Sequence, residues 1–328
     1  LVYINLIESL KMLYIDADKV HQTLDYSSLV ENLYESHKVD IKAASTTIFE
    51  KPTPSGQKSY FLSSAAWQKD EAIGAKLVTV FPDNERDYNG LPTVQAVYIL
   101  FDGETGKPSA CIDGTALTLR KTAADSALGT RLLANPHPEK MLMIGAGALA
   151  PHLIEAHCAV RNTISEIKIW NRTPERAQNV IDQVTVSGLK INATEDLRDA
   201  LEQADLISCA TMATAPLVKG PFLKSGAHLD LVGSYRPDMM ECDENTMSRG
   251  SIFTDSPWSA VEDSGEIICA LNSGAIKRSD ILGNLFDLCK GHHSGRVRED
   301  EITVFKNGGG GHLDLMVARY LVSQIEGY

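Results

Sequence analysis

An apolar strand pattern that runs straight into a glycine-rich turn constrains the fold of this chain more than any other feature. Met141–Ile144 is followed by Gly145-Ala146-Gly147-Ala148-Leu149-Ala150, of the form G-x-G-x-x-A, and then by a helical pattern. The first glycine permits a tight turn, the second lets a pyrophosphate approach the backbone, and the small final residue lets helix and strand pack closely. The free N–H groups at the helix start would face the phosphates. The pattern predicts a Rossmann nucleotide site; a glycine turn in another α/β fold is the alternative.

Segments of strand and helix character alternate from Lys140 onward. Strands are expected at residues 141–147, 166–171, 204–211 and 227–235, and helices at 148–160, 174–186 and 193–203. Short links between such segments are typical of a parallel sheet covered by helices. The chain is therefore predicted to be an α/β protein with a Rossmann domain at residues 119–302.

The first third of the chain has a different texture. A helix is expected at 29–37, strands at 75–81 and 93–102, a hairpin turn at 102–106 and a helix at 116–133. After Thr303 come one more apolar strand, four glycines at Gly308–Gly311 and a terminal helical pattern. We expect this tail to return to the first domain. Residues 1–118 with 303–328 would then form a discontinuous α+β domain for substrate binding and dimerisation.

Composition limits the function. A length of 328 residues suits two domains, and a formal net charge of −12 without a basic run argues against binding to nucleic acid. No apolar stretch reaches the roughly 18 residues of a membrane span, and the opening LVYINLIESLKMLYI lacks the basic start of a signal peptide. The six cysteines form no C-x-x-C pair. We expect reduced, buried thiols, a cytoplasmic location and no metal site.

The end of the second Rossmann strand indicates which dinucleotide binds. NAD-binding versions carry an acid there that bonds the ribose 2′-OH, but this strand ends in Asn171-Arg172-Thr173. Arg172 can pair with a 2′-phosphate, and Thr173 before Pro174 suits a helix N-cap. The pattern favours NADPH; a capped turn with a solvated arginine is the alternative. The predicted cofactor contacts are Thr122, Gly145, Ala146, Gly147, Ala148, Leu149, Asn171, Arg172, Thr173, Arg176, Thr211, Met212, Gly233 and Ser234.

Seven sequence blocks in a fixed order give a more specific signal. They are Gly74–Thr79, Gly90-Leu91-Pro92-Thr93, Leu119–Ala124, Ile144–Ala148, Trp170–Thr173, Gly233–Asp238 and Thr303–Lys306. With these blocks the chain resembles the ornithine cyclodeaminase/mu-crystallin family along nearly its whole length. That family includes ornithine cyclodeaminase, an archaeal-type alanine dehydrogenase, ketimine reductases and pyrroline-2-carboxylate reductases. The resemblance implies hydride exchange at an amino-acid Cα through an imine.

The resemblance also implies a substrate site. Lys76 and Arg120 stand where the family has residues that hold the substrate carboxylate or assist proton transfer. A guanidinium can hold a carboxylate bidentately, and an ammonium can protonate an imine nitrogen. His312 is a candidate acid, and Thr93, Gly310 and Gly311 are further candidate substrate contacts. Taken alone, Lys76 could be a strand-edge lysine, Arg120 a surface helix arginine and His312 a solvated loop histidine.

Three departures from the family pattern bear on the activity. Cyclodeaminases have an aspartate after Gly-Gly that handles the ornithine amine, and Tyr235 stands there in this chain. The family often has an arginine near residues 44–48, where this chain has none, so either Lys51 or Lys58 takes over its role or the role is absent. The glycine run at 308–311 differs from the commoner S-V-G-x-A pattern, and we interpret it as a loop beside the nicotinamide.

The sequence thus predicts NADPH-dependent reduction of a cyclic imino acid. Δ1-Pyrroline-2-carboxylate would give L-proline, with Δ1-piperideine-2-carboxylate, which would give L-pipecolate, as a further candidate substrate. The partners expected are this small molecule and a second copy of the chain in a homodimer, and no membrane. The alternatives are an amino-acid dehydrogenase or opine-type reductive aminase, an ornithine cyclodeaminase, or a non-catalytic binding protein like mu-crystallin.

Overall fold

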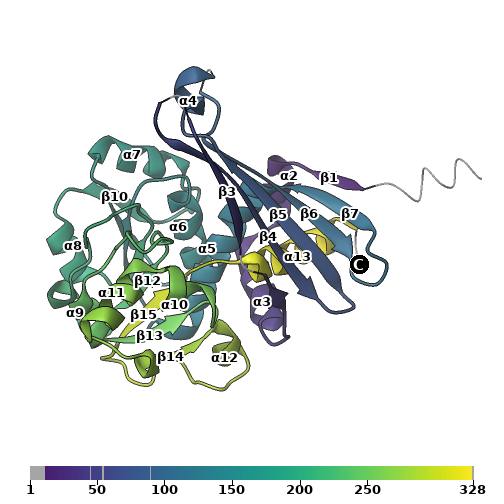
Figure 1. The fold of residues 1–328 in the computed structure, drawn as a ribbon. Coiled ribbons are helices and arrows are strands. Elements are labelled where there is room, and N and C mark those ends of the chain that lie inside the picture. The colour runs from purple at the N-terminus through teal and green to yellow at the C-terminus, as the bar shows by residue number, and fades with distance from the viewer. Residues whose placement is uncertain (1–11, 45, 54, 89, 327–328) are drawn as a thin grey trace, which may run out of the picture. The chain divides into compact units, whose positions relative to one another are not determined.

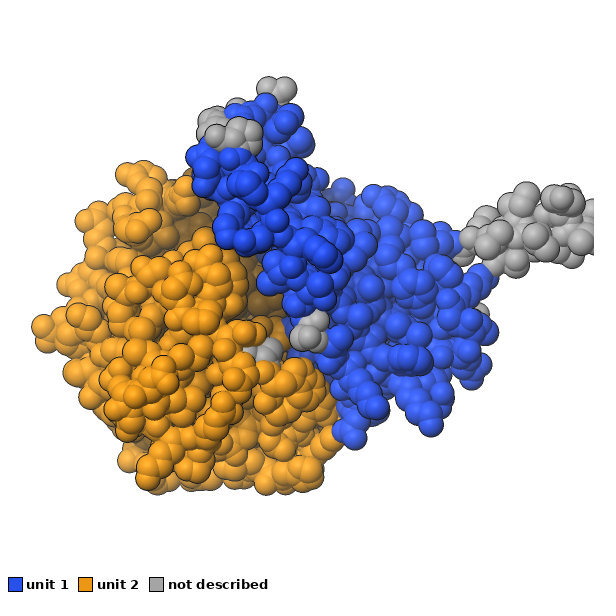
Figure 2. Space-filling view, in the orientation of Figure 1, with its two compact units in different colours: residues 1–32, 39–121, 310–328 blue, residues 33–38, 122–309 orange. Residues whose placement is uncertain are grey.

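The computed structural model describes residues 12–44, 46–53, 55–88 and 90–326. The chain divides into two compact units, which Figure 2 colours separately. Unit 1 comprises residues 1–32, 39–121 and 310–328, and unit 2 comprises residues 33–38 and 122–309. The helices within the described ranges are too short or too polar to cross a membrane. The opening residues 1–11, on which the expectation about a signal peptide rests, lie outside the described part of the chain.

Unit 1 is built on a largely antiparallel sheet (Figure 1). Its strands are β1 (Leu13–Ile15), β2 (Lys42–Ala43), β3 (Thr47–Pro52), β4 (Lys58–Gln68), β5 (Ala72–Val80), β6 (Val94–Asp102) and β7 (Pro108–Asp113). The strand order is β1-β7-β6-β5-β4-β2, and β3 also pairs with β4. Only β1 and β7 run parallel among these described pairs. The predicted hairpin is present as β6 and β7, and the Asp102 carboxylate closes its turn by accepting from the N–H of Thr105.

One face of this sheet is covered and the other is open. The helices of unit 1 are α2 (Ala17–Thr23), the start of α3 (Tyr26–Ser36), α4 (Asn84–Asp87), the start of α5 (Gly114–Leu133) and α13 (Gly311–Glu326). Helix α13 packs on β4, β5 and β6, and the side chains of Ala66, Tyr98 and Leu100 are buried. On alternate positions of β4, Phe61 and Trp67 are exposed. This alternation is expected of a sheet with a single covered face.

Unit 2 contains an eight-stranded sheet in which every pair is parallel. Its strands are β8 (Lys140–Ile144), β9 (Glu166–Trp170), β10 (Lys190–Thr194), β11 (Leu206–Cys209), β12 (His228–Leu231), β13 (Gly250–Thr254), β14 (Ile281–Asn284) and β15 (Ile302–Lys306). The order is β10-β9-β8-β11-β12-β15-β13-β14. From β8 the chain adds β9 and β10 on one side, and it then returns to add β11 and β12 on the other side of β8. The strand order thus reverses between β8 and β11, and a Rossmann sheet binds its ligand at such a switch point.

Helices flank both faces of the parallel sheet. They include α6 (Ala150–Val160), α7 (Pro174–Gln183), α8 (Leu197–Gln203), α9 (Glu244–Arg249), α10 (Ser259–Asp263), α11 (Gly265–Ser273), α12 (Leu285–Cys289) and the 3-10 turns η1 (Gly220–Phe222) and η2 (Arg278–Asp280). Side chains of α8, α9 and α11 join the apolar core on one face. On the other face, buried Asp230 accepts from Ser126 of α5 and lies 3.2 Å from His157 of α6.

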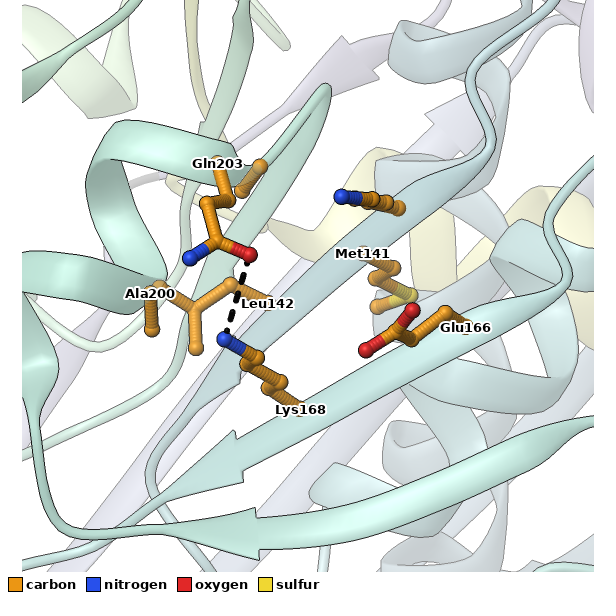
Figure 3. A pocket seen from close by; sticks show the side chains of 8 residues that line it. Met141, Leu142, Glu166, Lys168, Ala200 and Gln203 are labelled. Carbon is orange, nitrogen blue, oxygen red and sulfur yellow. Dashed lines mark hydrogen bonds between the residues drawn. The ribbon is translucent and has the colours of Figure 1, made fainter.

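A small hollow between the sheet and α8 is shown in Figure 3. It is lined by the starts of β8 and β9 and by α8, and Lys168 Nζ donates to Gln203 Oε1 at 3.3 Å. Its volume is about 10 Å³. That is room for about one water molecule, so this hollow is not a ligand site.

The predicted fold class is confirmed, with two local corrections. Strand β15 lies between β12 and β13, so residues 303–306 belong to the parallel sheet and not to the first domain as we expected. A strand that is apolar on both faces suits the middle of a parallel sheet. Residues 193–194 end β10, and α8 begins only at Leu197, where Asp196 caps it.

Candidate active site

The glycine turn follows β8 as predicted. Gly145 has a φ of +106°, and a Cβ there would lie 2.4 Å from the carbonyl oxygen of Ala210, so no other residue fits. A Cβ on Gly147 would meet open space. Helix α6 begins at Ala150, which is buried against the strand. The turn therefore has the close packing and the open backbone that a bound pyrophosphate requires.

A cavity of about 350 Å³ opens beside this turn at the switch point between β8 and β11. Its lining includes the predicted residues Gly145, Ala146, Gly147, Asn171, Arg172, Arg176, Thr211 and Met212. It is also lined by four residues that were not predicted as cofactor contacts, Trp170, Ala210, Ala213 and Leu217. No acidic side chain is among these described lining residues. The cavity and its glycine turn fit a dinucleotide, whose nicotinamide would supply the hydride.

The end of β9 and the first turn of α7 each present a cation to this cavity. The side chains of Arg172 and Arg176 are exposed, and Asn171 Nδ2 donates to the carbonyl of Thr173 at 2.8 Å. Thr173 occupies the N-cap position of α7 as expected, but its side chain makes no capping bond. The extended backbone of Thr173 and Pro174 in the first turn of α7 mark the start of the helix instead.

The other predicted cofactor residues do not line this cavity. They are Thr122, Ala148, Leu149, Thr173, Gly233 and Ser234. The carbonyl of Thr122 accepts from Asn307, and the buried Ser234 hydroxyl donates to the carbonyl of Met239. The N–H of Gly233 donates to Glu241. Their predicted contact with a dinucleotide stays a prediction.

Unit 1 contains a second polar site, a buried cluster of two ammonium groups and one carboxylate. Lys76 of β5 and Lys121 of α5 reach Asp314 of α13, with N–O distances of 2.9 Å and 2.8 Å to its two oxygens. Asp314 is fully buried, Lys121 is 3% exposed and Lys76 is 16% exposed. Lys121 also donates to the carbonyl of Gly310 at 3.1 Å. We call these three residues the Lys–Asp–Lys cluster.

Burial sets the charges of this cluster. It lowers the pKa of Lys121 to about 8, against the opposing effect of Asp314. Burial alone would raise the pKa of Asp314, but Lys121 and Lys76 outweigh it, so this pKa is lowered. Burial and the Asp314 charge raise the pKa of the nearby Tyr98 phenol well above its usual value. The cluster thus carries one net positive charge near neutral pH, which suits an anionic substrate.

Arg120 is placed differently from Lys76. Its guanidinium donates to the ring Nδ1 and the carbonyl of His21 in α2, at 3.1 Å and 3.0 Å, and lies 4.6 Å from the Tyr26 ring. The structure therefore brings Lys76 together with Lys121, the next residue of α5. Adjacent helical residues point about 100° apart, which is why one residue changes the partner.

The remaining predicted substrate residues have separate positions. Gly310 joins the cluster through its carbonyl. Gly311 starts α13, and a Cβ on it would lie 3.2 Å from the carbonyl oxygen of Ala65. Thr93 precedes the Val80–Val94 pair, several residues along the sheet from the Lys76–Tyr98 pair. His312 is fully buried in the first turn of α13, so it is not the solvated loop histidine of the alternative interpretation.

The residues tied to the family departures are surface groups. Lys58 forms an ion pair with Glu50 of β3, and Lys51 lies over the ring of Phe81, which follows β5. Tyr235 is 56% exposed. Ser45, within the segment that lacks the family arginine, lies outside the described residues.

Lys121 and Asp314 are the functional candidates that the sequence interpretation missed. Asp314 stands in the apolar run HLDLMVA, where a charged residue that is buried must be paired. That signal could have marked it as part of a site. The choice between Arg120 and Lys121 depends on the rotation of α5, which no local pattern determines.

Comparison with known proteins decides the family. The model of the ornithine cyclodeaminase/mu-crystallin family matches residues 45–327. The chain belongs to this family. The predicted resemblance is confirmed, and the protein is an oxidoreductase of the family.

Named relatives of the family cover nearly all of the chain. Delta(1)-pyrroline-2-carboxylate reductase of Paracoccus denitrificans is 40% identical over 93% of this chain and 94% of its own length. Protein SAR DEFICIENT 4 of Arabidopsis thaliana is 39% identical over 93% and 95%. The solved Delta(1)-pyrroline-2-carboxylate reductase of Thermococcus litoralis, in complex with NADH and L-proline, has a TM-score of 0.88 and 28% identity, covering 96% of this chain and 98% of that one.

Proposed function

We propose that this family member reduces the C=N bond of a cyclic imino acid, converting Δ1-pyrroline-2-carboxylate to L-proline with NADPH. The observation that carries the proposal is the Lys–Asp–Lys cluster, in which the buried ammonium of Lys121 and the partly buried ammonium of Lys76 share one buried carboxylate. Its surplus positive charge suits the carboxylate of an imino acid. Relatives named as reductases of this imino acid support the choice of substrate.

Within this proposal the cluster binds and protonates. Lys121, with Lys76, would hold the substrate carboxylate, while Asp314 offsets the repulsion between the two ammonium groups and orients them. Reduction adds a hydride to the imine carbon and a proton to the nitrogen. An ammonium of the cluster, or the predicted acid His312, would donate that proton to the imine nitrogen. Arg120 remains a candidate for the carboxylate, and the variants in the Discussion separate it from Lys121.

The preference for NADPH over NADH is the second part of the proposal. Arg172 and Arg176 at the cavity, and the absence of an acid among its described lining residues, support binding of a 2′-phosphate. The Thermococcus relative was solved with NADH. A preference for NADPH would therefore be a property of this chain's own β9 end.

A homodimer through unit 1 and a cytoplasmic location complete the proposal. The open face of the sheet carries Tyr14, Phe49, Phe61 and Trp67, each 40% exposed or more. Apolar patches of this kind mark interaction sites, and a second copy can cover such a face symmetrically.

One assay tests the reaction. NADPH oxidation is followed by its near-ultraviolet absorbance with Δ1-pyrroline-2-carboxylate, Δ1-piperideine-2-carboxylate and open-chain imino acids from 2-oxo acids with ammonia or amines. The expected result is fast turnover with the five-membered ring. Faster turnover of open-chain imines would favour the dehydrogenase or reductive aminase, and binding without turnover a non-catalytic role. Ammonia and proline released from ornithine would contradict the proposal, because Tyr235 offers a phenol where a carboxylate would pair with the ornithine ammonium.

A further inference from the structure

Glu241 is a fully buried carboxylate next to the dinucleotide cavity, and the reaction described above does not use it. It lies in the segment after β12, and its carbonyl accepts from the N–H groups of Leu217 and Val218 at 3.0 Å and 2.9 Å. The backbone that carries this side chain is therefore held beside Leu217, which lines the cavity.

The Glu241 carboxylate joins two loops of the nucleotide unit. Oε1 accepts from the N–H and the hydroxyl of Thr211, at 2.7 Å and 2.9 Å, and Oε2 accepts from the N–H of Gly233 at 2.7 Å. Thr211 follows β11 and lines the cavity, and Gly233 follows the neighbouring strand β12. A Cβ on Gly233 would lie 2.0 Å from the Thr211 carbonyl oxygen, so the loops are closely interlocked.

Ionisable groups surround this carboxylate on several elements. Lys306 of β15 and Glu266 of α11 are fully buried and form an ion pair at 3.2 Å. The thiols of Cys209 and Cys242 also face Glu241, and each has a raised pKa. Burial raises the pKa of Glu241 to about 7; Lys306 opposes this shift and Glu266 adds to it.

We propose that Glu241 is a positioning residue for the dinucleotide: its ionised carboxylate holds the loops after β11 and β12 in the geometry that binding requires. The two oxygens of the ionised carboxylate accept these three bonds, and a proton on either oxygen would remove an acceptor lone pair and add a donor beside the N–H donors. Protonation of Glu241 would release Gly233 or Thr211 and loosen the cavity wall. This inference rests on the proposed dinucleotide site.

The test measures the Kd of NADH by fluorescence from about pH 6 to about pH 8.5 in the intact protein. NADH is the probe because it lacks the 2′-phosphate of NADPH, which itself titrates near pH 6. We expect the Kd to rise as pH falls through about 7, approaching tenfold per pH unit when Glu241 alone titrates. A Kd that does not change over this range would overturn the inference.

Two variants assign the titration. Glu241→Gln should bind NADH about tenfold or more weakly at high pH, because the side-chain NH2 group would face an N–H donor. Its Kd for NADH should no longer depend on pH. Its kcat at saturating dinucleotide should change less than its Kd. Glu266→Gln, equally buried but bonded to neither loop, should keep tight binding and move the midpoint to lower pH, because a repulsive charge is removed.

Other outcomes separate the role of Glu241 from the proposed function. If circular dichroism shows that Glu241→Gln is unfolded, the pH dependence of the Kd in the wild type and the midpoint shift in Glu266→Gln test the inference. An unchanged pH dependence in folded Glu241→Gln, or no shift of the midpoint in Glu266→Gln, would refute the role of Glu241 alone. Failure of the wild type to bind either NADH or NADPH would instead refute the proposed function.

Discussion

The ammonium of Lys121 lies 2.8 Å from a carboxylate oxygen of Asp314, and both side chains are buried. A buried ion pair contributes little net stability, because removing two charges from water costs about as much as their attraction returns. Lys76 on the other oxygen gives this pair a surplus positive charge. The arrangement is therefore better explained by the binding of an anion than by stability of the fold.

Replacing Lys121 should impair catalysis more than replacing its neighbour Arg120. We expect Lys121→Met to lower kcat/KM for the imino acid by about a hundredfold, the effect of losing a charged hydrogen bond to substrate. Arg120→Met removes the contacts with His21 and Tyr26, so it should destabilise the protein by about 1–2 kcal/mol and change kcat/KM less than about fivefold. Steady-state kinetics and urea unfolding of both variants check this. A larger loss of kcat/KM in Arg120→Met than in Lys121→Met would assign binding of the substrate carboxylate to Arg120.

The activity should fall at alkaline pH. The pKa of Lys121 is lowered to about 8, so its ammonium is lost as pH rises through that value, while the substrate carboxylate stays ionised. The pH profile of kcat/KM should therefore descend above about pH 8. In Lys121→Arg the guanidinium stays charged, and the descending limb should move to higher pH. The same limb in both proteins would assign it to another group.

The sequence predicted the nucleotide unit well because its signals are local. The glycine turn, the strand before it and the end of β9 lie within about thirty residues, and period and spacing determine each of them. The cluster of unit 1 joins β5, α5 and α13, which are distant in the sequence. No local pattern specifies that Lys121 points to Asp314 and Arg120 to His21. The place of β15 in the sheet depends likewise on long-range pairing.

Changing Arg172 should change the choice of dinucleotide. Arg172→Asp removes a cation from the cavity and adds an acid that can bond a ribose 2′-OH. We expect the ratio of kcat/KM with NADPH to that with NADH to fall by about a hundredfold. Lys190→Asp in β10, an equal change in charge outside the cavity, is the control and should leave the ratio unchanged. A wild type that uses both dinucleotides equally would contradict the interpretation of Asn171-Arg172-Thr173.

Charges on the open sheet face of unit 1 should disrupt the dimer. Light scattering of the wild type at micromolar concentration should give twice the chain mass of 35.7 kDa. The double variant Phe61→Asp/Trp67→Asp should be monomeric, because two desolvated carboxylates would oppose each other across the symmetric interface. Val297→Asp, at an apolar position of unit 2 that is 66% exposed, is the matched control and should stay dimeric. A monomeric wild type would remove this part of the proposal.

Removing the Asp314 carboxylate should separate stability from catalysis. Asp314→Asn leaves the two ammonium groups without a countercharge in a buried site, so we expect a loss of about 3–5 kcal/mol in the free energy of unfolding and little activity. Adding Lys121→Met removes the more buried of the two ammonium groups. The double variant should therefore regain much of the stability, measured by urea unfolding, but none of the activity. If Asp314→Asn were as stable as the wild type, or if the double variant were less stable than the single one, the two lysines would not depend on Asp314 for their charge.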